Sequence, residues 1–455
     1  MSEIMERIIR LLAVAMLLNT SCTKEFLDKK PNKSLVVPSS LENFQAILDN
    51  SFNVFGVSPF MNQIADGDFY VTENGIPSLA NLSRNIYLWQ DDIYEGATST
   101  DWNRMYEQVF YANIVLEGLE KIKGNPDQRY MDRLRGTALF CRAYAYYNLA
   151  QEFTPPYHAE RAASDLGLPL RTSADVNSHP NRASLQDTYQ LMIDDLQQAE
   201  LLLPITVEPK TRPTKAAAWA LLARITLSMA DYETALHAAD KALSFQNDLM
   251  DFNTLDTVAA SPFPSGRSVY NKEIIYYTDR ITNTFFNSAN TRVVEDLYDL
   301  YDDNDLRKLI FFNNGRFKGS YGGSALFIFT GLATDELYLI RAECYARTGR
   351  TAEARDDLTQ LMRTRWKKDR IYNVPTDLDE GEVLQMILSE RRKELLTRGT
   401  RWSDLRRLNQ EEMFKTTLKR NYQGVEYLLS PGDPRCVFPI AMDELELGGI
   451  EQNPR

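Results

Sequence analysis

Apolar residues recur every three or four positions over most of this chain, which is the spacing that places them on one face of an α-helix. The pattern predicts a mainly α-helical protein with six strong helical segments: 102–123, 131–152, 184–203, 215–244, 333–365 and 381–398. Most of these segments follow one another closely. We therefore expect pairs of packed helices, at about 102–152, 184–244, 333–365 and 381–409.

Small residues recur at matching positions in two of these pairs. They are separated by seven and then five positions, as Ala223, Ala230 and Ala235 in one pair and Ala342, Gly349 and Ala354 in the other. This resembles the tetratricopeptide repeat, in which small residues let the two helices of a hairpin approach closely. Because each pair exposes an apolar face that a neighbouring pair covers, the resemblance implies one continuous helical scaffold.

Two regions lack helical periodicity, at 52–101 and 250–329, and both are rich in aromatic residues, Asn, Gly, Ser, Asp and Pro. Binding residues are often carried by loops on a rigid scaffold, so these two loop regions are where a ligand is expected. Within the second region, the apolar run at 273–278 predicts one short β-strand.

Composition excludes some classes of function. The chain has 455 residues with 51 Lys and Arg against 63 Asp and Glu, and a net charge of -12 does not favour nucleic acid. The three histidines are scattered and no HExxH, GxSxG or P-loop occurs, so neither an enzyme nor a cofactor is predicted. A glycosidase needs only two placed carboxylates and stays open. The acidic run Asp302-Asp303-Asn304-Asp305 lacks the Gly and distal Glu of a calcium loop, so no metal is assigned.

The N-terminus predicts export and a lipid anchor. The apolar run 8–18 is too short to span a bilayer and is typical of a signal peptide, whether Met1 or Met5 is the start. Small residues precede Cys22, as a lipoprotein signal peptidase requires. We expect a signal peptide at 1–21, lipidation of Cys22 and a tether at 22–40.

The richest motif is Glu390 to Arg407, ERRKELLTRGTRWSDLRR. Glu390 and Glu394 lie one helical turn apart and require neutralising arginines, of which Arg391, Arg392, Arg398 and Arg401 are nearest in sequence. Gly399 suits the left-handed residue that ends a helix, and a second short helix is expected at 403–408, with Trp402 packed beneath the corner. These charges predict an internal ion-pair network, in preference to an anion-binding site.

This motif resembles the C-terminal signature of the SusD/RagB family, roughly ERR-x-EL followed by G-x-RW-x-DLRR. The tail agrees as well, in Phe438-Pro439-Ile440, Glu444-Leu445 and Gln452-Asn453-Pro454, although Arg455 stands where the family has Gly. The resemblance implies a single SusD-like domain at 41–455. It also implies a lipid-anchored outer-membrane protein that binds oligosaccharides at the cell surface and serves a SusC-like TonB-dependent transporter.

The same resemblance implies an exposed, aromatic-lined ligand site built from the loop regions. The candidates are Asp66, Asp68, Phe69, Tyr70, Trp89, Tyr94, Arg280, Phe285, Phe286, Asn287 and Tyr321. For each of them, burial beneath its loop is the alternative. Trp89 is the only Trp of the loop regions, which leaves peptide uptake as a second possibility for the ligand. A helical-repeat adaptor that binds a protein and no nutrient is the third hypothesis.

Overall fold

The computed structural model describes residues 38–264, 270–286, 288–324 and 326–455. Residues 40–455 form one compact unit. The predicted signal peptide, Cys22 and nearly all of the tether lie outside the described residues. Among the helices that are described, none is both long and apolar enough to cross a bilayer.

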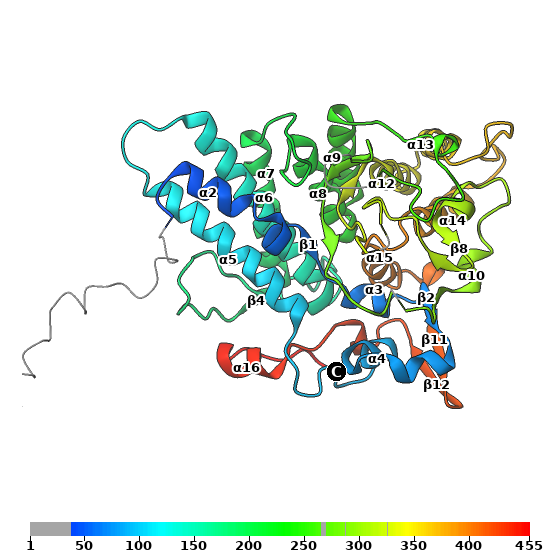
Figure 1. Ribbon diagram of the computed structural model, residues 1–455, viewed down its shortest axis with the longest axis horizontal. Coiled ribbons are helices and arrows are strands. Elements are labelled where there is room, and N and C mark those ends of the chain that lie inside the picture. Colours follow the sequence, from blue (N-terminus) through cyan, green and yellow to red (C-terminus); the bar gives the residue numbers. More distant parts are fainter. Residues whose placement is uncertain (1–37, 265–269, 287, 325) are drawn as a thin grey trace, which may run out of the picture. The chain divides into compact units, whose positions relative to one another are not determined.

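The mainly helical fold predicted from the sequence is confirmed, and packed helices form its scaffold (Figure 1). The first helices are α2 (Leu41–Leu48), α5 (Thr100–Glu120), α6 (Gln128–Phe153) and α7 (Leu185–Leu202). α6 packs against both α5 and α7, and every residue from Gly136 to Phe153 is buried. Polar side chains set where the helices begin, since the Ser99 hydroxyl accepts a hydrogen bond from the Trp102 amide at the start of α5.

Two helix hairpins follow, in agreement with the expected tetratricopeptide-like pairs. They are α8 (Lys215–Ser228) with α9 (Tyr232–Phe245), and α12 (Thr334–Arg347) with α13 (Thr351–Arg363). The tight turns lie at Ala230 and Gly349, whose φ angles are 59° and 76°. α9 packs against α12, which joins the two hairpins into one scaffold.

Six short strand pairs complete the fold of the described residues. The predicted strand at 273–278 is confirmed as β5 (Ile274–Tyr276), which pairs with β10 (Leu332–Ala333). The others are β1 (Val57–Ser58) with β6 (Asp279–Arg280), β2 (Phe69–Val71) with β7 (Thr291–Val293), β3 (Leu166–Pro169) with β4 (Arg182–Ser184), β8 (Phe312–Asn313) with β9 (Arg316–Phe317), and β11 (Leu418–Tyr422) with β12 (Val425–Leu429). Because β1 and β2 belong to the first loop region and β6 and β7 to the second, hydrogen bonds join the two regions.

Short helical elements run through the predicted loop regions and the C-terminal part. The α-helices are α3 (Met61–Ala65), α4 (Asn81–Tyr87), α10 (Glu295–Tyr298), α11 (Arg307–Phe311) and α16 (Met442–Gly448). A π-helical turn, η2 (Ser51–Phe55), and the 3-10 turns η3 (Glu73–Ser78), η4 (Phe252–Thr254), η5 (Glu412–Phe414) and η6 (Pro434–Cys436) accompany them. The loop regions are thus more ordered than their sequence predicts.

The signature motif forms the expected corner between α14 (Glu380–Glu394) and α15 (Arg401–Leu408). Gly399 has the predicted left-handed conformation, with φ of 76°. Trp402 is 1% exposed and stacks face to face on Phe438, with ring centroids 5.5 Å apart. The motif therefore holds the C-terminal segment against the helical scaffold.

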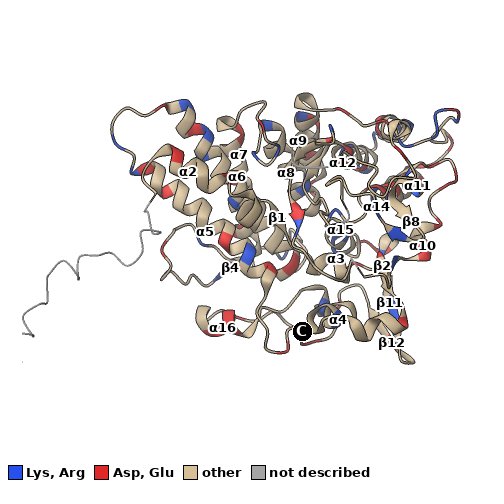
Figure 2. Ribbon diagram, in the orientation of Figure 1, with Lys and Arg blue, Asp and Glu red and all other residues tan. Residues whose placement is uncertain are grey.

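The predicted ion-pair network exists, but its partners differ from the expected ones. Arg307 Nη2 lies 2.5 Å from Glu390 Oε2, and Arg307 Nη1 lies 2.9 Å from Glu394 Oε2. Figure 2 shows acidic and basic residues close together around α11 and α14. The arginines that were expected to neutralise these two glutamates pair elsewhere: Arg391 with Asp404, Arg392 and Arg401 with Asp68, and Arg398 with Asp335. Helical spacing identifies only charged partners that are close in the sequence, whereas the fold buries these glutamates beside arginines that are distant in the sequence.

Candidate binding site

Several residues predicted to bind a ligand do lie together. The ring centroids of Phe69 and Phe286 are 5.3 Å apart, and those of Phe285 and Phe286 are 4.8 Å apart. The Arg280 guanidinium lies 3.8 Å from the centroid of the Phe286 ring. The pairing of β2 with β7 causes this meeting, because it joins the segments that carry Phe69 and Phe286.

Burial contradicts the expectation that these residues form an exposed platform. Eight of the predicted residues are buried, namely Asp66, Asp68, Phe69, Trp89, Tyr94, Arg280, Phe285 and Tyr321. Tyr70 is 36% exposed, Phe286 is half-buried, and Asn287 lies outside the described residues. The physical reason is that strand pairing folds both loop regions inward, where the rings gain free energy by leaving water.

Internal partners occupy polar groups of several of these buried residues. Asp68 Oδ1 accepts a hydrogen bond from Arg392 Nε at 2.8 Å, and Trp89 Nε1 donates to the Ala65 carbonyl at 3.1 Å. The Tyr321 hydroxyl lies 3.0 Å from Glu273 Oε2. Burial, together with the charge of Asp68, raises the pKa of Asp66 well above its usual range. These contacts are those of structural residues.

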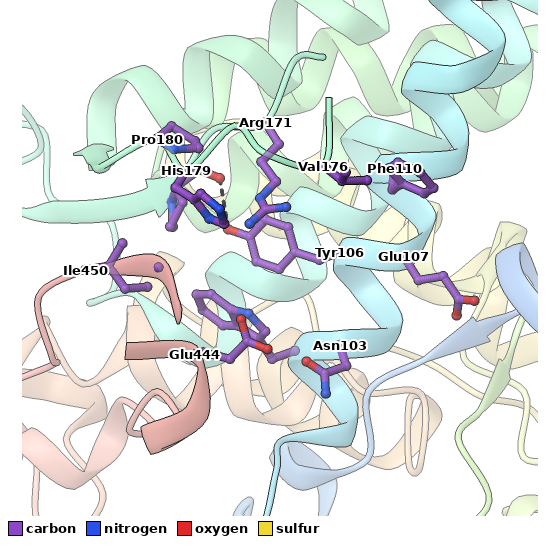
Figure 3. A pocket seen from close by; sticks show the side chains of 13 residues that line it. Asn103, Tyr106, Glu107, Phe110, Arg171, Val176, His179, Pro180, Glu444 and Ile450 are labelled. Carbon is purple, nitrogen blue, oxygen red and sulfur yellow. Dashed lines mark hydrogen bonds between the residues drawn. The ribbon is translucent and has the colours of Figure 1, made fainter. Parts of the chain in front are cut away.

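An open cavity elsewhere is lined by partly exposed aromatic rings, which the predicted loop residues mostly do not offer. It has a volume of about 360 Å³ and lies between the first turns of α5, the segment 169–180 and the C-terminal segment that contains α16. Trp102, Tyr106 and Phe110 line it from α5 (Figure 3). Because they are four residues apart along one helix, their side chains share one face. Tyr106 and Phe110 are half-buried, so parts of both rings are open to a ligand.

The aromatic wall is fixed by its own contacts. The Trp102 and Tyr106 rings lie 4.7 Å apart at an angle of 45°. The Tyr106 hydroxyl donates to the Pro169 carbonyl at 2.9 Å. Phe153 packs edge-on against Trp102, with centroids 5.0 Å apart. A wall held in this way loses little conformational entropy when a ligand binds.

Polar side chains surround these rings. Arg171 extends over the Tyr106 ring, with its guanidinium carbon 5.9 Å from the centroid, and Asn103 and Glu444 lie on the other side of the cavity (Figure 3). Burial raises the pKa of Glu444, and its interaction with Trp102 partly offsets this rise. Glu107 pairs with Arg104 at 2.6 Å. Flat apolar faces beside donors and acceptors suit a molecule that is apolar on its face and polar at its edge.

Sequence reasoning missed this cavity because its lining comes from three segments that are distant from one another in the sequence. Trp102 was assigned to the scaffold, and the spacing of four among Trp102, Tyr106 and Phe110 was the available signal. Arg171 lies in an insertion that shows only loop character in the sequence. Glu444 lies in a tail that identified the family resemblance and nothing more. Only the tertiary fold brings the three segments together.

Other cavities offer fewer rings. One of about 460 Å³ is lined by four prolines together with Arg406. Another of about 780 Å³ lies beside Phe245 and Tyr270. Tyr94, a predicted ligand residue, lines a smaller cavity of about 250 Å³ together with Arg455. The α5 cavity is the strongest candidate site, since three rings from one helix line it.

A group of three buried carboxylates also has the spacing to hold a cation. It consists of Glu273, Asp335 and Glu394. Arg365 Nη2 lies 2.9 Å from Glu273 Oε2 and 2.7 Å from Glu394 Oε1, and Arg398 Nη1 lies 3.0 Å from Asp335 Oδ2. Because guanidinium groups neutralise these carboxylates, the group belongs to the ion-pair network.

Comparison with known proteins places the chain among relatives. Residues 25–227 match a family described as starch-binding and associating with outer membrane, and residues 307–444 match the SusD family. SusD-like protein P2 of Formosa agariphila is 28% identical over 155 residues, which are 34% of this chain and 28% of that protein's length. SusD-like protein P38 of the same organism is 22% identical over 382 residues, 68% of this chain and 72% of that protein.

Solved structures share the fold. A SusD superfamily protein from Bacteroides vulgatus, 20% identical, aligns over 92% of this chain and 99% of its own, with a TM-score of 0.74. A SusD-like carbohydrate binding protein from the same species, 19% identical, aligns over 90% and 97%, with a TM-score of 0.68. Two separate stretches of the sequence match SusD-type family models, and the fold is shared with solved SusD superfamily structures, so the chain belongs to the SusD/RagB family.

Proposed function

We propose that this protein captures oligosaccharides at the outer membrane and delivers them, chemically unchanged, to a SusC-like TonB-dependent transporter. The α5 cavity carries the proposal, because the partly exposed rings of Tyr106 and Phe110 lie beside Arg171, Asn103 and Glu444. A sugar ring stacks its C–H face on an aromatic ring, while its hydroxyls bind charged and amide groups. The carbohydrate binding relative from Bacteroides vulgatus supports the same class of ligand through its shared fold.

Removing the aromatic wall tests the proposal. The purified chain is screened against a panel of defined neutral and acidic oligosaccharides and short peptides, and affinities are measured by calorimetry. Tyr106→Ala combined with Phe110→Ala is expected to weaken glycan binding about 30-fold or more, because two partly open rings are lost. Phe52→Ala is the control, since Phe52 is 66% exposed and does not line the cavity. Unchanged glycan affinity in the double variant would place the site elsewhere.

Tyr70 and Phe286 are two further candidate ligand residues, separate from the α5 cavity. Among the predicted ligand residues that the structure describes, they are the two that keep access to solvent, and Phe286 lies against the Arg280 guanidinium. β2, which carries Tyr70, lies far from α16 in Figure 1, so any ligand contact there is separate from the α5 cavity. Tyr70→Ala is therefore expected to leave ligand binding in the α5 cavity unchanged.

The lipid anchor and the transporter contact are parts of the same proposal. Cys22→Ser is expected to move the protein from the outer-membrane fraction to the soluble fraction of cells that express it. Copurification of a TonB-dependent barrel with the wild-type chain would support delivery. Tight binding of such a barrel without any ligand from the panel would favour the adaptor hypothesis instead.

Peptide capture is the second candidate function. It is favoured by the burial of Trp89, which is 2% exposed and therefore offers no stacking face in the loop regions. Peptide binding that depends on Tyr106 and Phe110, with no oligosaccharide bound, would replace the carbohydrate proposal.

A further inference from the structure

Arg171 differs from many of the deeply buried arginines of the scaffold in how its charge is paired. Many of those face a carboxylate at short range, as in Arg142 with Asp195 at 2.7 Å and Arg407 with Glu343 at 2.6 Å. Arg171 forms no ion pair with any carboxylate in the described parts of the chain, and its guanidinium contacts the Tyr106 ring. A half-buried positive charge without a carboxylate partner attracts an anion more strongly than a paired one does.

The backbone holds Arg171 in place at the cavity. The Tyr146 hydroxyl accepts a hydrogen bond from the Arg171 amide at 2.6 Å, and it also lies 2.9 Å from the Arg171 carbonyl oxygen. Asn113 Nδ2 donates to that carbonyl oxygen at 2.9 Å. Figure 3 shows the side chain pointing over Tyr106 and into the cavity. The backbone of Arg171 is thus fixed beside the cavity before any ligand arrives, with the side chain directed over Tyr106.

The two carboxylates that line the cavity have other partners. Glu107 pairs with Arg104 at 2.6 Å, so its charge is largely compensated there. Burial raises the pKa of Glu444, which favours its uncharged form. Neither carboxylate forms an ion pair with Arg171 among the described residues, so the guanidinium is available to a ligand.

We propose that the α5 cavity selects acidic sugars, with the carboxylate of a uronic acid residue paired to the Arg171 guanidinium while the sugar ring stacks on Tyr106 and Phe110. This inference rests on the proposed function of the same cavity. The planar fork of a guanidinium matches the two oxygens of a carboxylate, and charged hydrogen bonds are about twice as strong as neutral ones. Asn103 and Glu444 then bind the hydroxyls at the opposite edge of the sugar.

The experiment compares two trisaccharides that differ only at C6 of each sugar, which is a carboxylate in α-1,4-linked trigalacturonate and a neutral hydroxymethyl group in the galactotriose of the same linkage. Calorimetry on the full chain at low salt is expected to show the acidic trisaccharide bound about tenfold or more tightly. The ratio of the two affinities is expected to fall as salt rises, because ions screen a partly exposed pair.

Arg171→Gln is expected to bring the affinity ratio close to one, and Arg171→Lys to leave it intermediate, because Lys keeps the charge and loses the fork. Arg363→Gln is the matched control, since Arg363 is exposed in the last turn of α13 and its replacement by Gln makes the same change in net charge. Thermal unfolding of each variant verifies that it folds. The salt dependence of the wild-type ratio provides a test that needs no variant.

The possible outcomes distinguish failure of acidic selection from failure of the proposed oligosaccharide capture. Equal affinities for both trisaccharides in the wild-type chain, or a preference that survives Arg171→Gln, would overturn acidic selection and leave oligosaccharide capture standing. Binding of a peptide through its terminal carboxylate, dependent on Arg171 and without any sugar bound, would overturn both. Failure of the whole oligosaccharide panel would likewise overturn both.

Discussion

At the scale of single residues, buried charges are satisfied over long distances in the sequence. Arg307 meets Glu390 across 83 positions, and Arg365 meets Glu394 across 29. Arg307 and Glu394 are fully buried side chains, so neither is screened by water. Sequence spacing predicted that the glutamates required cations. The identity of those cations depended on the tertiary fold and could not be predicted.

Replacing Arg307 tests how strongly this network holds the fold. Arg307→Met is expected to lower the free energy of unfolding by about 3–5 kcal/mol, because Asp305, Glu390 and Glu394 are left as buried negative charges with fewer partners. Urea unfolding followed by circular dichroism measures the change. Lys308→Met is the control, since its pair with Asp303 lies at the surface and is expected to contribute little. Equal losses in the two variants would contradict the network.

At the scale of elements, the two helix hairpins use the same turn with different residues. Ala230 and Gly349 occupy matching positions in the sequence, and both have left-handed φ angles. That conformation strains any residue with a Cβ atom, whereas Gly adopts it freely. The shared spacing of small residues therefore reflects the turn as well as helix packing.

A pair of substitutions tests this reading of the turns. Ala230→Gly is expected to raise the free energy of unfolding by about 1 kcal/mol, and Gly349→Ala to lower it by about the same amount. A Cβ atom at Gly349 would meet nothing within 4 Å, so backbone strain alone is measured there. Ala352→Gly on the exposed face of α13 is the control, where loss of helix propensity predicts destabilisation. A destabilising Ala230→Gly would contradict the reading.

At the scale of the whole molecule, periodicity predicted the scaffold, and composition did not predict how the loop regions fold. Helical spacing located α5, α6 and α7 to within a few residues, because one buried stripe is a local property of the sequence. The aromatic loop residues gave no such local signal. Phe285 and Trp89 became core residues through strand pairing and distant contacts, whereas Tyr106 became a candidate ligand residue because α16 and the segment 169–180 leave its helix face open.

A pair of buried acids joins several distant parts of the molecule. Asp101 lies in the first turn of α5 and Glu152 near the end of α6, and burial together with the charge of Asp101 raises the pKa of Glu152. Asp101 Oδ2 accepts hydrogen bonds from the Phe60 and Met61 amides, each at 2.9 Å, and Glu152 Oε1 accepts one from Asn62 at 3.0 Å. The remaining oxygens, Asp101 Oδ1 and Glu152 Oε2, have no hydrogen-bond partner among the described residues. We expect a proton shared between the two carboxyl groups, because a protonated acid would satisfy both oxygens.

That shared proton makes the stability of the protein depend on pH. Burial raises the pKa of Asp101 to about 7, and burial with the charge of Asp101 raises that of Glu152 well above its usual range. The native state then holds protons that the unfolded chain has lost, so this stabilisation is complete below about pH 4 and is lost as pH rises through 7. Arg280, near Asp101, and Arg406, near Glu152, oppose the rise only in part.

Replacing the shared proton by an amide is expected to flatten this dependence. In Asp101→Asn the side-chain oxygen still accepts from the Phe60 and Met61 amides, and its NH₂ group donates to Glu152 without titrating. Urea unfolding at pH 5, 6, 7 and 8 is expected to show the free energy of unfolding of the wild type falling by up to about 1.4 kcal/mol per pH unit for each extra proton that the native state holds. The fall is expected to be shallower in Asp101→Asn, and Glu152→Gln is expected to shift the slope in the same direction. Since Glu273 is a further buried acid whose pKa burial raises, to about 7, the comparison uses the difference in slope between variant and wild type. Parallel slopes would show that the two carboxyl groups share no proton, and that the junction of α3, α5 and α6 is held by hydrogen bonds to the amides alone.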